Sequence, residues 1–244
     1  MINLAIDIGN TRCKLGLFAG VELIRQEIWP EIDAGRLAEY AYNQKVQNVI
    51  FSSVGQLEPD AIGPLPAGLT VLQLSAQTPL PIVNAYATPE TLGKDRLAAV
   101  VGAFELFPGE NCLVIDAGTC LTTDLLSAEG VYVGGNISPG IRMRLRAMHE
   151  FTARLPLVEP GPIDDLLGSS TETALRNGGQ LGAILETEQL ITRCEERFGP
   201  LRVLFTGGDA EVFEKSLKKK IFVNHNLVLL GLNKILRYNV PLQD

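Results

Sequence analysis

The 244-residue sequence contains few of the residue types on which several common classes of protein depend. It has only 4 cysteines and 2 histidines. The cysteines are scattered with no C-x-x-C pair, which argues against a zinc site or a disulfide framework and favours free thiols in a reducing cytoplasm. Two histidines almost exclude a histidine-based catalytic triad or a multi-histidine metal site. We therefore expect carboxylates to carry any acid–base chemistry.

An excess of positive charge is also missing. The chain has 21 Lys and Arg against 28 Asp and Glu, a formal net charge of −7, so we expect neither a nucleic-acid surface nor an anionic-membrane surface. No apolar run approaches the roughly 18 residues of a membrane span, and no basic region or apolar segment of a secretory leader precedes Asp7. With 46% hydrophobic and 20% charged residues, the chain is too apolar for intrinsic disorder. These absences predict a globular protein without a membrane anchor.

Hydrophobic periodicity predicts a mixed α/β fold. Short apolar or alternating segments predict strands at residues 3–6, 13–18, 21–28, 47–52, 70–74, 131–137 and 202–205. Longer periodic segments predict helices after Asp33 and at residues 91–107, 139–150, 178–198 and 227–238. The first three strands indicate a β-meander, and a β-α-β unit follows it.

The second half of the chain begins much as the first half does. Leu4–Thr11 and Leu113–Thr119 each place an apolar run before Asp-x-Gly, at an offset of 116 − 7 = 109 residues. Each is followed by a hairpin-like pattern, which favours a duplicated α/β domain. We place the boundary at Pro108-Gly109, with domains at 1–109 and 110–244 and a cleft between them.

The first of these turns suits phosphate binding. Gly9, two residues after Asp7, lets the chain turn sharply and direct backbone N–H groups toward a ligand. The Asp7 carboxylate is suited to hold Mg²⁺ or water that bridges to phosphate oxygens. Lys14 follows on the next strand, within reach of a phosphate. An Asp-Gly hairpin without a ligand and a solvated lysine are the alternatives at this stage.

Three further glycine turns lie in the second half. Asp116–Asp124 combines a glycine turn with threonine hydroxyls, and Thr206–Ala210 has paired glycines that permit close approach of a flat ligand, with Asp209 placed to cap a helix. Gly134–Gly140 leads into a basic helix, whose arginines we expect to be partly solvated, with one or two paired to acids. An ordinary β-α loop would also account for the Gly-Gly pair.

Gly93–Arg96 is the remaining candidate, in the first turns of an otherwise apolar helix. It places an acid, Asp95, beside a base, Arg96. A carboxylate near a helix N-terminus is favoured by the helix dipole in any case, so a capping charge is the alternative reading of Asp95.

Together these motifs resemble the type III pantothenate kinase family, a branch of the acetate kinase, sugar kinase, Hsp70 and actin superfamily. The resemblance spans residues 4 to 231 and is carried by motifs that occur in the family's order. They are Asp7-x-Gly9-Asn10-Thr11-x-x-Lys14-x-Gly16, Leu92-Gly93-x-Asp95-Arg96 after Tyr86 and Pro89, Asp116-x-Gly118-Thr119-x-x-Thr122-x-Asp124, Gly134-Gly135-x-Ile137-x-Pro139-Gly140, Gly168–Thr171 and Thr206-Gly207-Gly208-x-Ala210.

The resemblance implies two ribonuclease-H-like domains of the actin-like ATPase type with an ATP site between them, and a cytoplasmic homodimer. It implies an ATP-dependent transferase that phosphorylates pantothenate to 4'-phosphopantothenate, the first step of coenzyme A biosynthesis, with Mg²⁺ and a monovalent cation, K⁺ or NH₄⁺. A nucleotide or phosphate-ester hydrolase of the same superfamily and a non-catalytic interaction protein on an actin-like fold are the alternatives.

The resemblance also implies a role for each site residue. Asp95 would be the catalytic base, and Asp116 would hold the monovalent cation. The nucleotide would be held by Asp7, Ile8, Gly9, Asn10, Thr11, Arg12, Cys13, Lys14, Thr119, Gly207 and Gly208. Pantothenate would be held by Tyr86, Gly93, Lys94, Asp95, Arg96 and Thr171, although Thr173 competes with Thr171 for that assignment.

Overall fold

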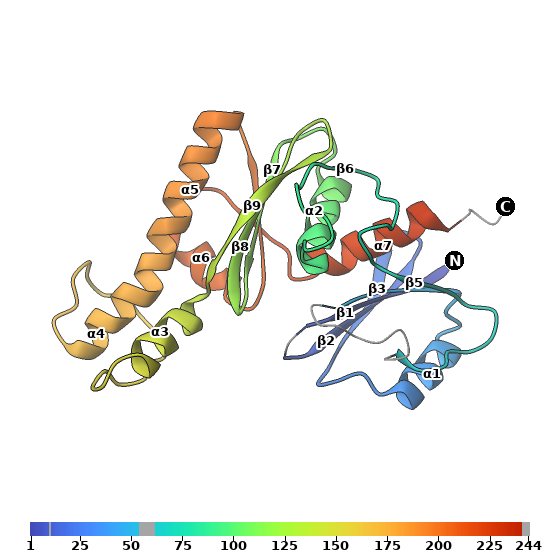
Figure 1. Cartoon of the computed structure of the whole chain (residues 1–244), viewed down its shortest axis with the longest axis horizontal. Helices are drawn as coiled ribbons and strands as arrows, with labels where there is room; N and C mark the ends of the chain where they lie inside the picture. Colours follow the sequence, from blue (N-terminus) through green and yellow to red (C-terminus); the bar gives the residue numbers. More distant parts are fainter. Residues whose placement is uncertain (10, 54–61, 241–244) are drawn as a thin grey trace. The chain divides into compact units, whose positions relative to one another are not determined.

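A computed structural model describes residues 1–9, 11–53 and 62–240 and divides into two compact units (Figure 1). Unit 1 contains residues 1–109, 126–134 and the chain from Asn226 on; unit 2 contains residues 110–125 and 135–225. The predicted boundary at Gly109 coincides with the end of the first segment of unit 1. The two halves predicted from the sequence repeat differ from the two compact units in two places. Residues 126–134 and the last helix belong to the second half of the sequence but to unit 1 of the structure. In the described ranges no helix is both long and apolar enough to cross a bilayer.

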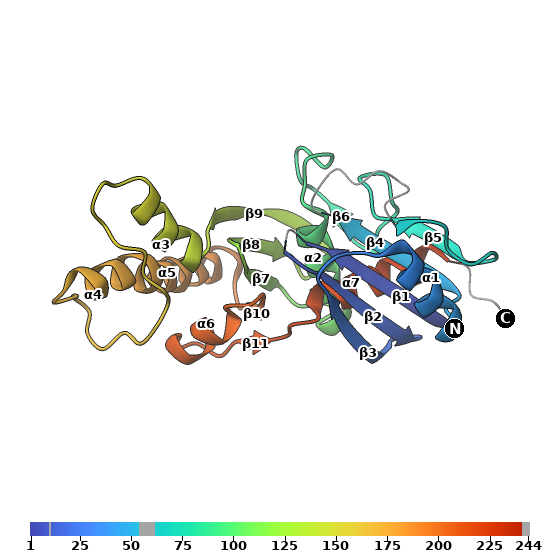
Figure 2. The same ribbon diagram turned by 90° about the horizontal axis from the view of Figure 1, so that it is seen from below.

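Unit 1 is built on a five-stranded sheet that begins with the predicted meander (Figure 2). The strand order is β3-β2-β1-β4-β5, with β2 antiparallel to β1 and β3, β4 parallel to β1, and β5 parallel to β4. The strands are β1 (Ile2–Ile8), β2 (Cys13–Ala19), β3 (Glu22–Trp29), β4 (Asn48–Ser53) and β5 (Thr70–Gln73). A two-residue strand, β6 (Val83–Asn84), lies outside this sheet.

Alternation along β1 divides its side chains between two layers. Leu4 and Ile6 belong to a buried cluster with Leu37 and Ala41 of helix α1 (Ala34–Asn43). The helix begins where the sequence predicts, because the Asp33 carboxylate accepts a hydrogen bond of 2.7 Å from the Arg36 N–H.

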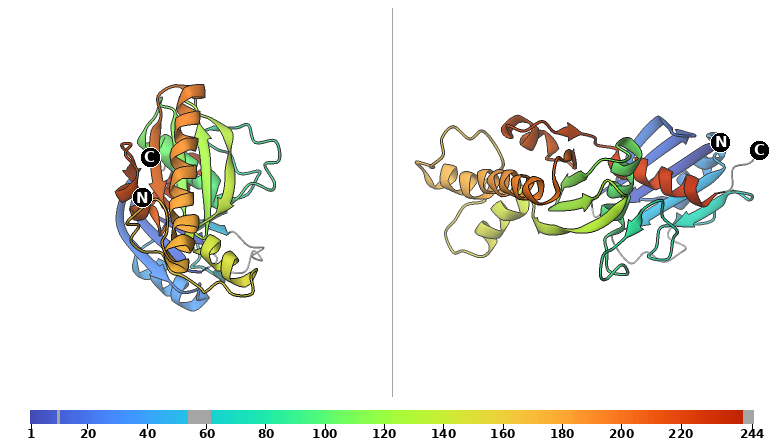
Figure 3. Two further views of the ribbon diagram at one scale, coloured as in Figure 1. Left: turned by 90° about the vertical axis from the view of Figure 1, so that its left-hand side faces the viewer. Right: turned by 90° about the horizontal axis from the view of Figure 1, so that it is seen from above.

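The other layer of unit 1 contains helix α7 (Leu227–Asn239), which a buried chain of amides ties to the sheet. Asn48 Nδ2 donates to Asn3 Oδ1 (2.9 Å), and Asn3 Nδ2 donates to Asn233 Oδ1 (3.0 Å). Asn233 Nδ2 in turn donates to the Gly20 carbonyl (2.9 Å). Buried amides require partners, so this network specifies how α7 lies on β1 and β4 (Figure 3).

Helix α2 (Lys94–Leu106) packs backbone to backbone against α7. A Cβ atom added at Gly231 would lie 1.7 Å from the Ala98 carbonyl oxygen, and one at Gly102 would lie 2.3 Å from the Leu227 carbonyl oxygen. Only glycine permits this approach, which places the first turn of α2 relative to the sheet of unit 1.

The sheet of unit 2 repeats the plan of unit 1. From β11 to β9 it has the order β11-β10-β7-β8-β9, with β10 parallel to β7 and β11 parallel to β10. Its strands are β7 (Cys112–Ala117), β8 (Cys120–Leu126), β9 (Val131–Pro139), β10 (Arg202–Thr206) and β11 (Phe222–Val223). Reading β7 to β11 as equivalents of β1 to β5 gives the same strand order in both sheets, as the predicted duplication requires.

Helices cover the core of unit 2. They are α3 (Ile141–Glu150), α4 (Thr171–Arg176), α5 (Gly182–Phe198) and α6 (Ala210–Ser216), with a π-helical turn at Asn177–Leu181 between α4 and α5. Ile184 and Ile191 of α5 are buried with Phe205 of β10 and Phe213 of α6, whose rings lie 5.3 Å apart.

Several predicted boundaries are wrong for local reasons. The helix predicted over 91–107 begins only at Lys94, because Thr91 donates from its N–H and its hydroxyl to the Thr88 carbonyl and closes a separate turn. The helix predicted over 178–198 is split by the π-helical turn. Asp209 occupies the N-cap position of α6, but its side chain makes no capping bond there.

The contact of α2 with α7 gives a stability prediction. Gly231→Ala should lower the free energy of unfolding by roughly 1–3 kcal/mol or more, because the new methyl group meets backbone that cannot rotate away. Gly182→Ala is the matched control: its Cβ would meet nothing nearer than 3.9 Å, so it should stabilise by about 0.5–1 kcal/mol. Urea titrations of both variants check this, and equal stability of the two would contradict the close packing.

Candidate active site

The first phosphate motif lies at the turn from β1 to β2 in unit 1. Asp7 is opposite Lys14 in the antiparallel register, and the Gly9 N–H donates to the Arg12 carbonyl at 3.2 Å. Thr11 and Arg12 are exposed at this turn. The turn therefore brings an acid and a base to one strand end, beside exposed residues.

Three other members of the first motif differ in what the structure shows of them. Cys13 is buried in the core, where burial raises the pKa of its thiol, and Ile8 packs against the same cluster. The side chains of these two residues face the core, so only their backbone is available to a ligand at the turn. Asn10 lies outside the described residues.

Asp7 is held in a setting that disfavours its ionised form. The Ser52 hydroxyl of β4 donates to Asp7 Oδ1 at 3.3 Å. Burial raises the pKa of Asp7 to about 6; the charge of Lys14 opposes that rise, and the charge of Asp95 adds to it. A second cation beside Lys14 would therefore stabilise the ionised form of Asp7.

Asp95 and Arg96 lie in the first turn of α2, also in unit 1. The Arg96 N–H donates to Asp95 Oδ1 at 2.9 Å, which orients the carboxylate at the helix end. A Cβ atom at Gly93 would lie 2.6 Å from the same oxygen, so the absence of a side chain at Gly93 makes room for the Asp95 carboxylate. Asp95 is partly buried and Arg96 is buried.

An aromatic pair extends this cluster. The Tyr86 ring is stacked on Tyr132, with centroids 5.8 Å apart and an interplanar angle of 18°, and the Arg96 guanidinium carbon lies 5.7 Å from the Tyr86 centroid. Tyr86 was predicted as a site residue and Tyr132 was not. The alternation of residues 131–137 indicates only a strand, so no local signal could have assigned Tyr132 to the neighbourhood of Tyr86.

Lys94 directs its charge to the backbone. Its Nζ donates to the carbonyls of Leu92 (3.1 Å) and Pro89 (3.4 Å), and burial lowers its pKa. The ammonium group therefore stabilises the turn that leads into α2. Contact of Lys94 with a substrate remains a prediction.

In unit 2, two predicted turns meet at Asp116. The parallel register sets Asp116 beside Thr206, and the next residue, Gly207, has φ +93°. A Cβ atom at Gly207 would lie 2.4 Å from Asp116 Oδ1. The Asp209 N–H donates to the Ala117 carbonyl at 2.9 Å, which fixes the second turn on the first.

The turn after β9 joins the same group. The Gly140 N–H donates to the Thr119 carbonyl at 3.1 Å, and a Cβ atom at Gly140 would lie 2.3 Å from the Gly118 carbonyl oxygen. Thr119 and Gly208 are exposed beside these turns. Three motifs that are far apart in the sequence thus converge in unit 2.

The arginines of α3 are all paired with acids, rather than one or two of them. Arg142 pairs with Glu159, Arg144 with Glu186 at 2.6 Å and Arg146 with Glu150 at 3.3 Å. Burial raises the pKa of Asp209, and the charge of Arg142 partly opposes that rise.

The structure separates the two candidate threonines of α4. Thr173 Oγ1 accepts from the Ser170 N–H (3.0 Å) and donates to the Ser170 carbonyl (3.1 Å) as part of a capping box. Its hydroxyl is thus used inside the helix end. Thr171 is exposed at the first residue of the helix, which favours it as the threonine for a ligand.

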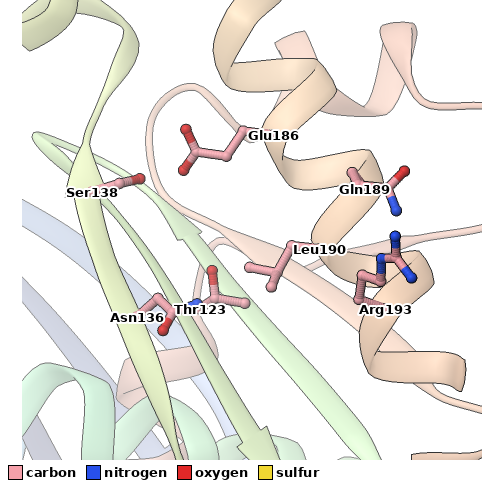
Figure 4. A pocket seen from close by; sticks show the side chains of 7 residues that line it. All are labelled: Thr123, Asn136, Ser138, Glu186, Gln189, Leu190 and Arg193. Carbon is pink, nitrogen blue, oxygen red and sulfur yellow. The ribbon is translucent and has the colours of Figure 1, made fainter. Parts of the chain in front are cut away.

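A cavity of about 350 Å³ in unit 2 contains none of the predicted site residues. It lies between α5 and the strands β8 and β9 (Figure 4), lined by Thr123, Asn136, Ser138, Glu186, Gln189, Leu190 and Arg193. Arg144 reaches both Glu186 and the Ser138 hydroxyl, and Arg193 pairs with Glu196. The two charged side chains that line the cavity, Glu186 and Arg193, thus have partners within the protein.

The described ranges contain no group of three or more His, Cys, Asp or Glu side chains placed to hold a metal ion. A cation at Asp7 or Asp116 would therefore need further oxygen ligands from substrate, backbone or water.

Comparisons with known proteins show the family of the chain. Residues 3–193 match the family model described as type III pantothenate kinase. A protein of that name from Christiangramia forsetii is 42% identical over 240 residues, 98% of this chain and 99% of its own. Another from Bacteroides fragilis is 44% identical over 240 residues, 98% of both chains.

Solved structures show the same fold at lower identity. A Campylobacter jejuni protein described as a Baf family transcriptional activator aligns with TM-score 0.62 and 22% identity, covering 97% of this chain and 98% of its own. The ROK hexokinase of Thermus thermophilus aligns with TM-score 0.51 and 15% identity, covering 99% and 100%. At these identities the likeness shows the fold alone, the two-domain plan of sugar kinases and actin-like ATPases.

The raised pKa of Asp7 predicts a stability gain when its charge is removed. Ionisation of Asp7 costs folding free energy above pH 6, on the order of 1–3 kcal/mol, and costs nothing below about pH 4, where the carboxyl is protonated in both states. Asp7→Asn should therefore be more stable than the wild type at pH 7.5, with a difference that shrinks toward pH 4.

Urea unfolding without nucleotide at several pH values measures this effect. Glu129→Gln is the control, because a hydrogen bond from Ser127 lowers the pKa of that exposed acid and its removal should not stabilise. A destabilised Asp7→Asn at pH 7.5 would show that the carboxylate is well solvated or fully paired.

Proposed function

The chain belongs to the type III pantothenate kinase family, and from that premise we propose that it transfers the γ-phosphoryl group of ATP to the terminal hydroxyl of pantothenate. One observation carries the proposal. Unit 1 alone contains both Asp95, whose charge helps to raise the pKa of Asp7 at the first phosphate motif, and Arg96, whose guanidinium carbon lies 5.7 Å from the Tyr86 centroid. A base, a phosphate turn and a cationic anchor are what transfer to an acid-bearing alcohol needs.

The proposed mechanism is in-line attack, in which positioning and neutralisation of charge supply most of the acceleration. Asp95 accepts the proton of the attacking hydroxyl as the new O–P bond forms and the bond to the leaving ADP breaks. Arg96 pairs with the pantothenate carboxylate, for which a guanidinium fork is suited. Gly93, Lys94 and Tyr86 belong to the same proposed acceptor pocket, and Thr171 of a second copy of the chain completes it.

The nucleotide is proposed to use both units. Residues 8–13 form the turn at the phosphates, Lys14 supplies charge to the phosphates, and Thr119, Gly207 and Gly208 supply the turns of unit 2. These turns fit the assignment because their glycines let the backbone come close to a flat or anionic ligand.

Two cations belong to the proposal. The partly buried Asp7 carboxylate is suited to hold Mg²⁺ or water on it, and Asp116 is suited to hold K⁺ or NH₄⁺. Such cations neutralise charge on the phosphates during transfer. The offset of 109 residues that relates Asp7 to Asp116 also relates Lys14 to Thr123, so the second turn has an acid without the matching lysine.

A homodimer and a cytoplasmic location complete the proposal. Leu166 and Leu167 are 66% and 80% exposed and stand shortly before Thr171, an exposure that is typical of a surface covered by another protein. We infer that a second copy covers them and that Thr171 completes its acceptor pocket. All four cysteines are free thiols, as a reducing compartment requires.

Asp95→Asn tests the assignment of the base. The amide preserves shape but cannot accept the proton, so kcat should fall by roughly 10²–10⁴ while KM for ATP stays within about twofold. Steady-state assays with pantothenate measure both constants.

The matched control is Asp33→Asn, which makes the same chemical change at the start of α1 in the same unit. It should leave kcat unchanged, since asparagine also caps helices. Near wild-type turnover by Asp95→Asn would reduce Asp95 to a charge at a helix end.

Asp116, which has no lysine at the position equivalent to Lys14, leads to a prediction about monovalent cations. With Mg²⁺ present, activity should be near zero in sodium buffer and restored by millimolar K⁺ or NH₄⁺, and Asp116→Ala should lose that response. Glu214→Ala, an exposed acid of unit 2, should keep it. Equal rates with and without K⁺, at constant ionic strength and with potassium-free ATP, would leave Asp116 no role in holding a monovalent ion.

A further inference from the structure

Tyr132 is buried at the end of a hairpin that the second half of the chain contributes to unit 1. It is 0% exposed and lies on β9 within residues 126–134. Gly130 at the hairpin turn has φ +76°, and a Cβ atom there would lie 3.3 Å from the Phe104 ring of α2. The end of the hairpin is thus packed on the helix whose first turn carries Asp95 and Arg96.

The backbone of this hairpin determines where Tyr86 lies. β6 pairs in parallel with β9 (Figure 1), and two hydrogen bonds join them: the Val83 N–H donates to the Gly130 carbonyl at 2.9 Å and the Ala85 N–H donates to the Tyr132 carbonyl at 3.1 Å. The Tyr86 N–H then donates to Asn84 Oδ1 at 3.1 Å. Residues 83–86 have their path set by these bonds.

The side chain of Tyr132 adds an aromatic contact to the backbone bonds. Its ring stacks on Tyr86, whose ring lies beside the Arg96 guanidinium at 5.7 Å. Tyr86 is only partly buried, whereas Tyr132 is fully buried and cannot itself meet a substrate. A rigid inner ring therefore limits the movement of the outer ring, and the outer ring limits that of the guanidinium.

We propose that Tyr132 is a positioning residue for the acceptor: by stacking on Tyr86 it holds Tyr86 and Arg96 in the arrangement that binds a carboxylate-bearing alcohol. The inference rests on the proposed function, because it assigns pantothenate to Tyr86 and Arg96. Tyr132 acts through Tyr86 and makes no contact with the reacting atoms. It affects acceptor binding and leaves the nucleotide and the proton transfer at Asp95 unaffected.

The test compares KM with kcat in variants that keep or remove the ring. Tyr132→Leu should raise KM for pantothenate roughly threefold to tenfold, the usual worth of an aromatic pair, with kcat and KM for ATP within about twofold. Tyr132→Phe keeps the ring and should keep the wild-type KM for pantothenate. Tyr132→Met, which fills more of the volume without a ring, should behave as Tyr132→Leu and serves if the leucine variant does not fold.

Two controls separate positioning from general destabilisation. Phe18→Leu removes an equally buried ring of unit 1 that is no part of the proposed site, so it should lower stability and leave KM for pantothenate unchanged. The double variant Tyr86→Ala/Tyr132→Leu should have the same KM as Tyr86→Ala alone, since Tyr132 acts through Tyr86.

The outcomes distinguish failure of the positioning role of Tyr132 from failure of the proposed acceptor site. If Tyr86→Ala and Arg96→Ala raise KM for pantothenate but Tyr132→Leu and Tyr132→Met do not, the positioning role is wrong and the acceptor site stands. Equal losses in Tyr132→Phe and Tyr132→Leu would assign the effect to the hydroxyl and overturn the stacking argument. If Tyr86→Ala and Arg96→Ala leave KM unchanged, the proposed acceptor site itself fails.

Discussion

The backbone contact between α2 and α7 determines where the proposed catalytic acid lies. Gly231 against the Ala98 carbonyl and Gly102 against the Leu227 carbonyl leave no room for a side chain between the helices. The asparagine network of Asn3, Asn48 and Asn233 then holds α7 on the sheet. The position of Asp95 relative to Asp7 within unit 1 follows from these two sets of contacts, neither of which includes a residue of the proposed site.

Duplication explains why one strand-and-turn design appears twice with different chemistry. The two sheets share a strand order, and each places an aspartate at the end of its first strand. Asp7 is opposite Lys14, has Ser52 as a hydrogen-bond donor and feels the charge of Asp95. Asp116 is instead crowded by the glycine turn at Gly207. We propose that the same geometry serves phosphate and Mg²⁺ in one half and a monovalent ion in the other.

Much of this arrangement is predictable from local patterns. Alternation and apolar runs indicate the meander and the parallel strands, and glycines beside acids indicate turns that the structure brings together in unit 2. The two-residue strands β6 and β11 are too short to leave a periodic signal. The contact of Tyr132 with Tyr86 joins residues 46 positions apart, and the assignment of residues 126–134 to unit 1 depends on packing that no local pattern encodes.

The central claim is that this chain phosphorylates an acceptor and does not merely hydrolyse ATP. The most direct measurement follows ADP and the mass of the acceptor together, with purified protein, Mg²⁺, K⁺ and ATP, over small alcohols that include pantothenate. The account predicts that ADP forms only when pantothenate is present, in equal amount to a product heavier by one phosphoryl group. ADP release at the same rate without an acceptor, with no phosphorylated product, would contradict it.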